Sequence, residues 1–116
     1  MRSLRSSVLR WPGREEVDRA VRAWAAETAA RHPRVVRVGY FGSYARGDWG
    51  VGSDVDVVVL LSESDEPFPR RAAAFDATEL PVPADVFAYT VEEWEALARR
   101  GGLARTVERE VVWVHP

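Results

Sequence analysis

Hydrophobic residues recur along the first part of the chain at the spacing of a helix. Between residues 14 and 31, Val17, Val21 and Trp24 are separated by three or four positions, with charged residues in the gaps, as in an amphipathic helix with one buried face. The abundance of alanine also favours a helix in this range. The His-Pro pair at 32–33 predicts its end, because the residue before a proline avoids the helical conformation.

Four short runs rich in valine and aromatic residues predict β-strands. They cover residues 35–41, 54–61, 82–89 and 111–114. The second run, DVDVVVLL, is almost continuously apolar after its acidic start, which is typical of a central strand that is covered on both faces. Together the four runs predict one sheet of ordinary size.

The segments between these strands predict turns and helices. Three glycines within residues 44–52 indicate a short helical turn followed by a loop. Residues 70–80 are expected to be helical up to the prolines that follow them. Thr90 and Glu93 have the spacing of a capping box, in which each side chain binds the backbone amide of the other, so a helix is expected over residues 91–100.

The alternation of helices and strands predicts an α/β (α+β) fold, with a mixed β-sheet of about four strands flanked by helices. A length of 116 residues fits one domain, expected over residues 1–116. Residues 1–13 show no clear period, so we expect a flexible or loosely packed N-terminal segment there. No signal peptide is expected, and no run approaches the ~20 apolar residues of a membrane span.

Composition excludes several kinds of catalysis. All 16 basic residues are arginines, and the chain has neither lysine nor cysteine. A Walker-type lysine, a Schiff-base lysine, a thiol nucleophile and a cysteine zinc site are therefore ruled out. His32 lies at a predicted helix end and His115 near the C-terminus, which argues against a Ser-His-Asp triad or a two-histidine metal site. Catalysis would have to use carboxylates, hydroxyls, arginines and backbone amides.

Charge and cysteine content bear on location and partners. The formal net charge is -2, which gives no general attraction to nucleic acid or to an anionic membrane. The absence of cysteine agrees with a reducing compartment. We therefore expect a cytoplasmic protein that binds neither nucleic acid nor membrane directly.

Two aspartates open the second predicted strand. Residues i and i+2 of a strand point to the same face, so Asp54 and Asp56 present two carboxylates side by side. Ionised carboxylates at this spacing raise each other's pKa unless a cation lies between them. Mg²⁺ suits such ligands, since it usually takes one or two carboxylates together with substrate phosphates and water. A Mg²⁺ site is therefore expected at Asp54 and Asp56.

A glycine-serine turn directly follows the first predicted strand. Gly42 lets the backbone approach a ligand closely, and nearby amides can then point at a phosphate. Ser43 can donate its hydroxyl to a phosphate oxygen, while Arg46 can contact phosphate or pair with a nearby carboxylate. Ser53 is assigned to the same nucleotide site, although its hydroxyl also suits a hydrogen bond within its loop. The turn and the aspartates together predict a triphosphate site beside a divalent metal, as phosphoryl or nucleotidyl transfer requires.

A third carboxylate is expected on the third strand. Asp85 lies in the otherwise apolar run PVPADVFAY, where an acidic residue is costly unless it is paired or binds a metal. If this strand neighbours the strand of Asp56, Asp85 would hold a second metal ion and help to deprotonate an acceptor hydroxyl. Asp76 and Glu79 are the alternative candidates, because the sequence alone does not give the strand order.

The segment FGSYARGDWGVGSDVDVVVLL, residues 41–61, resembles the signature of the DNA polymerase beta-type nucleotidyltransferase superfamily. There a Gly-Ser turn and an Arg-Gly pair precede Ser-Asp-x-Asp. The segment is most similar to the minimal nucleotidyltransferase branch and departs mildly at Val57, where leucine is commoner. The resemblance implies a nucleoside triphosphate bound with Mg²⁺ at the Gly-Ser turn, metal ligation by both aspartates, and a third acidic residue on a later strand.

The same resemblance implies a function. It favours a Mg²⁺-dependent enzyme that moves a nucleoside monophosphate, AMP from ATP or the equivalent from another nucleoside triphosphate, to a hydroxyl of a protein or small molecule, as the antitoxin of a HEPN-domain partner. The alternative is a catalytically weak nucleotide-binding module that neutralises such a partner by contact. An aminoglycoside-modifying transferase is a third reading, disfavoured because those enzymes usually carry an additional helical region. Homo- or hetero-oligomers are compatible with each.

Overall fold

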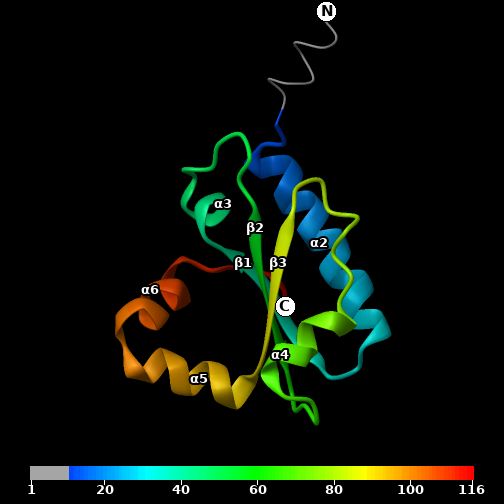
Figure 1. The fold of residues 1–116 in the computed structure, drawn as a ribbon, viewed down its shortest axis with the longest axis vertical. Helices are drawn as coiled ribbons and strands as arrows, with labels where there is room; N and C mark the ends of the chain where they lie inside the picture. The colour runs from blue at the N-terminus through cyan, green and yellow to red at the C-terminus, as the bar shows by residue number, and fades with distance from the viewer. Residues whose placement is uncertain (1–10) are drawn as a thin grey trace, which may run out of the picture.

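The computed structural model describes residues 11–116 and places four strands in one mixed sheet (Figure 1). The strands are β1 (Val35–Phe41), β2 (Val55–Leu61), β3 (Ala84–Thr90) and β4 (Val112–His115), in the sheet order β3-β2-β1-β4. β1 pairs antiparallel with β2 and β4, whereas β2 pairs parallel with β3. The expected mixed sheet is confirmed, and β2 lies between β1 and β3.

Helices lie on both faces of this sheet. α2 (Arg14–Arg31) covers one face, and α5 (Val91–Arg100) and α6 (Gly102–Glu110) lie on the opposite side (Figure 1). Shorter elements complete the chain: α3 (Ser43–Arg46), α4 (Phe68–Arg71) and the 3-10 turn η1 (Ala72–Ala74). Within residues 11–116, none of these helices has the length and apolar character needed to cross a bilayer.

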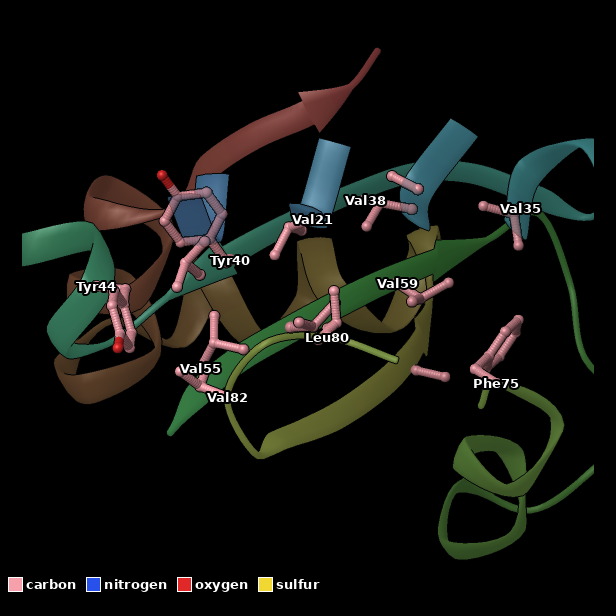
Figure 2. Packing of buried hydrophobic residues seen from close by; sticks show 14 of the residues in the cluster. Val21, Val35, Val38, Tyr40, Tyr44, Val55, Val59, Phe75, Leu80 and Val82 are labelled. Carbon is pink, nitrogen blue, oxygen red and sulfur yellow. The ribbon is translucent and has the colours of Figure 1, made fainter. Parts of the chain in front are cut away.

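The side chains of β2 alternate between two apolar clusters. Val55, Val57 and Val59 belong to the cluster on the α2 side, where Figure 2 shows Val55 and Val59 among the packed side chains. Val58 points the other way and packs with Trp94 of α5. This alternation follows from strand geometry, and it confirms that β2 is a central strand covered on both faces.

The buried face of α2 matches the one expected from its hydrophobic spacing. Val17, Val21 and Ala25 are fully buried. Trp24 is partly buried against the same core and donates its indole N–H to the carbonyl oxygen of Asp76 at 2.8 Å. The helix is therefore held by the core and by the loop that precedes β3.

The chain before α2 is packed where the structure describes it. The indole N–H of Trp11 donates to the Tyr44 hydroxyl at 3.1 Å, and that hydroxyl donates to the carbonyl oxygen of Pro12 at 2.9 Å. Trp11 also packs against the core on the α2 side. Trp11 and Pro12 are thus in contact with the domain, whereas residues 1–10 of the expected loose N-terminal segment lie outside the described part of the chain.

The helix expected over residues 70–80 is wrong in its second half. The helical turns end at Ala74, and Phe75 has extended backbone angles. The Asp76 carboxylate then accepts hydrogen bonds from the amide and the hydroxyl of Thr78, at 3.0 and 2.6 Å. Such side-chain bonds to nearby backbone groups compete with helix formation. The segment therefore forms a loop that leads into β3.

The capping box expected at Thr90 and Glu93 is present at the start of α5. The Glu93 carboxylate also accepts two hydrogen bonds from the Arg71 guanidinium, at 2.6 and 3.1 Å. The Arg71 side chain is only 8% exposed, whereas that of Glu93 is 43% exposed. Bonding to Arg71, and then to the Thr90 amide, lowers the pKa of Glu93 to about 2. The pair joins α4 to α5.

Replacing Glu93 with glutamine should lower the free energy of unfolding at neutral pH by about 1–2 kcal/mol, because Arg71 loses a charged partner that solvent partly screens. The folded pKa of Glu93 lies below its unfolded value. The contribution of Glu93 to the free energy of unfolding is therefore complete above the usual glutamate pKa and disappears as the pH falls toward about 2. Urea unfolding across this range should show the wild-type advantage shrinking with falling pH.

Glu27→Gln is the matched control for this series. It removes an exposed pair with Arg31 within α2, and such a pair contributes about 0.2–0.5 kcal/mol. A loss for Glu93→Gln no larger than that for the control, or a gap that does not depend on pH, would contradict the prediction.

Candidate active site

The glycine-serine turn lies directly against the acidic end of β2. Gly42 follows β1, is buried, and has φ of 83° and ψ of -154°, a combination that is essentially confined to glycine. A Cβ atom at this position would overlap with Oδ2 of Asp56. Glycine therefore allows the turn and the carboxylate to lie closer together than any other residue would permit.

Asp56 and Asp85 occupy opposite positions on neighbouring strands. β2 and β3 run parallel, and their register pairs Asp56 with Asp85. Because Val55 and Val57 pack toward α2, alternation directs Asp56 to the other face of the sheet. Asp56 is half-buried and Asp85 is exposed. The strand adjacency on which the assignment of Asp85 depended is therefore present.

Asp54 completes a group that we call the acidic cluster, Asp54, Asp56 and Asp85. Asp54 is exposed and lies one residue before β2. Burial raises the pKa of Asp56, and the charges of Asp85 and then Asp54 raise it further, while Arg46 lowers it. Negative charge is thus concentrated at this end of the sheet, and a cation would stabilise its ionised form.

The two alternative carboxylates lie elsewhere. The Asp76 side chain binds Thr78, as described above. Glu79 lines a pocket together with α2 residues, among them Trp24. The strand pairing therefore favours Asp85 over both as the third acid beside Asp56.

Arg46 is paired with carboxylates in the structure. Its Nε donates to Oδ2 of Asp48 at 3.1 Å, and its Nη1 lies 3.4 Å from Oε1 of Glu110. The same Glu110 oxygen accepts the backbone N–H of Gly42 at 3.0 Å. Of the two roles that the sequence left open for Arg46, the ion pair is the one that the structure shows.

Glu110 was not indicated by the sequence. It ends α6 just before β4, and it reaches Gly42 because β4 pairs with β1. Tyr40 pairs with Val112 in that ladder. Because the strands are antiparallel, moving two residues forward from Tyr40 to Gly42 corresponds to moving two residues back from Val112 to Glu110, which brings these two residues together. Only knowledge of the sheet order could have revealed this contact.

The remaining residues of the motif support the loop and the core. Oγ of Ser53 accepts the N–H of Gly50 at 2.8 Å, the loop bond that the sequence also allowed. Tyr44 is fully buried and stacks on Trp49 with ring centroids 5.6 Å apart. Ser43 is half-buried beside Gly42. The assignment of Ser43 and Ser53 to nucleotide binding remains a prediction.

The acidic cluster suits a metal that shares its ligands with a substrate. Among residues 11–116, no group of three or more acidic or histidine side chains is arranged so that it could hold a metal ion, and the three aspartates of the acidic cluster are no exception. Mg²⁺ usually binds through one or two carboxylates and takes its other ligands from substrate phosphates and water. Hard carboxylate oxygens on Asp54, Asp56 and Asp85, with the raised pKa of Asp56, fit that kind of site.

Comparison with known families identifies the motif. The family model described as "Nucleotidyltransferase domain" matches residues 22–111, a range that contains the Gly42 turn and the whole acidic cluster. Members of this family generally use a nucleoside triphosphate and a divalent metal ion. A search of curated proteins gives no match.

A solved structure agrees with the fold. A protein from Sulfolobus solfataricus, solved at 1.40 Å resolution and provisionally described as a nucleotidyltransferase, is similar with a TM-score of 0.60. The sequences are 20% identical, and the match covers 72% of this chain and 75% of that one. At this identity the likeness establishes a nucleotidyltransferase-like arrangement of the sheet and helices.

Substituting alanine for Gly42 should destabilise the fold by about 2–4 kcal/mol, since it adds backbone strain and a clash with Asp56. Gly47→Ala is a close control, because Gly47 also has positive φ but an added Cβ would meet no atom within 4 Å. That control should cost only about 1–2 kcal/mol of backbone strain. Chemical denaturation measures both, and equal losses would contradict the proposed contact between the turn and Asp56.

Exchanging Asp56 for asparagine should raise the free energy of unfolding of the metal-free protein at neutral pH, because it removes a half-buried charge beside two like charges. Added Mg²⁺ should stabilise the wild type more than the variant. Thermal unfolding with and without Mg²⁺ gives both comparisons. Asp65→Asn, an exposed acid that pairs with Arg34, serves as control. A less stable Asp56→Asn protein would refute the prediction.

Proposed function

The chain belongs to the nucleotidyltransferase domain family, and we propose that it is a Mg²⁺-dependent enzyme that transfers AMP from ATP to a hydroxyl group. The observation that carries this proposal is the register of β2 and β3, which brings Asp56 and Asp85 together beside the Gly42 turn. A phosphate-binding turn and a metal-binding group of acids are the two parts that nucleotidyl transfer needs at one site.

The Gly42–Ser43 turn would bind the triphosphate. Gly42 presents a backbone N–H that already holds a carboxylate oxygen at 3.0 Å, so the amide points to where an anion can lie. Ser43 adds a hydroxyl next to it, and Arg46 adds a guanidinium within reach of the same point. These three donors would fix the β- and γ-phosphates and leave the α-phosphate toward the acids.

The reaction is a single displacement at the α-phosphorus. The acceptor oxygen forms a bond to that phosphorus, the bond to the bridging oxygen of the β-phosphate breaks, and pyrophosphate leaves with the electron pair. Asp85, which is exposed and next to Asp56, would accept the hydroxyl proton. Mg²⁺, held by the acidic cluster, would neutralise charge on the phosphates and align the attacking and leaving oxygens.

An acceptor would approach from the side of β3. β3 is an edge strand, and a groove of about 810 Å³ runs beside it, with Asp85, Phe87 and Leu80 among its lining residues. The groove is lined mainly by apolar side chains, so it suits an acceptor with an apolar portion next to its hydroxyl. The likeness to the minimal branch makes the tyrosine of a HEPN-domain partner the first acceptor to test.

Transfer of labelled phosphate tests the proposal. The protein is incubated with Mg²⁺ and ATP labelled at the α-phosphate, with and without a HEPN-domain protein. Asp56→Asn and Asp85→Asn should each reduce the rate of transfer by about 100-fold or more, since one removes a metal ligand and the other the proton acceptor. Asp54→Asn should also reduce it, whereas Asp65→Asn should not.

Two outcomes would contradict the proposal. Transfer that continues unchanged in Asp56→Asn would remove the acidic cluster from the mechanism. Binding of ATP without transfer to any acceptor or to the protein itself would instead favour the nucleotide-binding module that neutralises a partner by contact.

A further inference from the structure

A carboxylate of the protein itself lies where the proposed function puts a phosphate. Oε1 of Glu110 accepts the N–H of Gly42 at 3.0 Å and lies 3.4 Å from Nη1 of Arg46. A phosphate oxygen would use the same two donors, because both prefer an anionic acceptor. Glu110 therefore uses donors that the nucleotide needs.

The contact is built into the fold. Glu110 is the last residue of α6, and its side chain is only 18% exposed. β4 starts two residues later and pairs with β1, with Val112 opposite Tyr40. The N–H of Val111 donates to the carbonyl oxygen of Val107 at 3.0 Å. Glu110 is thus positioned by a helix end and a strand rather than by a loop.

The position of Glu110 is electrostatically unfavourable apart from these contacts. Its charge adds to those of Asp85 and Asp54 in acting on Asp56. Arg46 compensates only in part, because it also pairs with Asp48. The like charges of the acidic cluster oppose a carboxylate at this position, and a more highly charged anion that enters with a cation can replace it.

We propose that Glu110 is an internal competitor for the phosphate position, which a nucleoside triphosphate must displace from Gly42 and Arg46 in order to bind. The inference rests on the proposed function, in which this turn holds the triphosphate. Glu110 occupies both donors and weakens binding of the triphosphate by the free energy needed to break its contacts.

Glu110→Gln tests this role, because glutamine keeps the size of the side chain and removes its charge. Isothermal titration with inorganic tripolyphosphate and with ATP, both with Mg²⁺, measures affinity without requiring transfer. The variant should bind each about threefold to tenfold more tightly than the wild type, the range expected when the ligand has to displace a neutral amide oxygen instead of a charged carboxylate. Glu95→Gln, an exposed acid on α5, should leave both affinities unchanged.

The amide resonance of Gly42 gives a second measurement that does not depend on the variant. In the wild type, saturating tripolyphosphate should shift the ¹H–¹⁵N signal of Gly42, because the hydrogen-bond acceptor changes from Glu110 to phosphate. Glu110→Gln should shift the same signal before any ligand is added. Circular dichroism checks that the variant remains folded.

Several results would overturn the inference. They are equal or weaker binding of tripolyphosphate by a folded Glu110→Gln protein, no binding by either protein, or a Gly42 signal that saturating ligand does not move. Transfer that depends on Asp56 and Asp85 without tighter binding by Glu110→Gln would leave the proposed function intact and refute the competitor role. Tighter binding by Glu110→Gln without transfer would support the competitor role and contradict the proposed function.

Discussion

The sheet holds two carboxylates, Asp56 and Asp85, at facing positions on adjacent parallel strands, and the other parts of the site are arranged around that pair. Their repulsion would separate them if the strands could slip. Slippage is opposed because β2 is buried on both faces: a shift of one residue would exchange Val57 with Val58 between two different clusters. The apolar core therefore determines the charge density at the end of the sheet.

This arrangement of like charges lowers the stability of the fold. Burial and like charge raise the pKa of Asp56, so the ionised cluster is a cost to the metal-free fold. By contrast, Glu93 has a full partner in Arg71 and a lowered pKa. Both acids are fixed by tertiary contacts. The contacts of Glu93 neutralise its charge, whereas those of Asp56 leave its charge without a partner cation in contact among the residues that the structure describes. Glu93 is therefore suited to a structural role and Asp56 to binding a cation.

Sequence patterns correctly predicted the elements whose conformation depends on residues within the same element. The spacing of Val17 and Val21, the valine run of β2, and the Thr90 capping box each act within one element. The prediction of a helix was wrong where a short side chain bonds to nearby groups in place of the helical hydrogen bonds, as Asp76 does beyond η1. It also left Asp85 conditional and Glu110 unnoticed, since both reach the site only through strand pairing. The motif could be predicted from the sequence, whereas its neighbours depended on the sheet order.

The charges around the turn also bear on how a nucleotide would enter. Asp54, Asp56, Asp85 and Glu110 contribute four acids, against which Arg46 is the cation in contact. A triphosphate alone would meet net repulsion there, so the two proposals together require the anion to arrive with its cation. A cation alone would remove the repulsion between the acidic cluster and Glu110, so it would not by itself release Gly42. The triphosphate that arrives with the cation supplies the stronger competitor, and displacement of Glu110 is therefore expected to be coupled to binding of the nucleotide and the metal together.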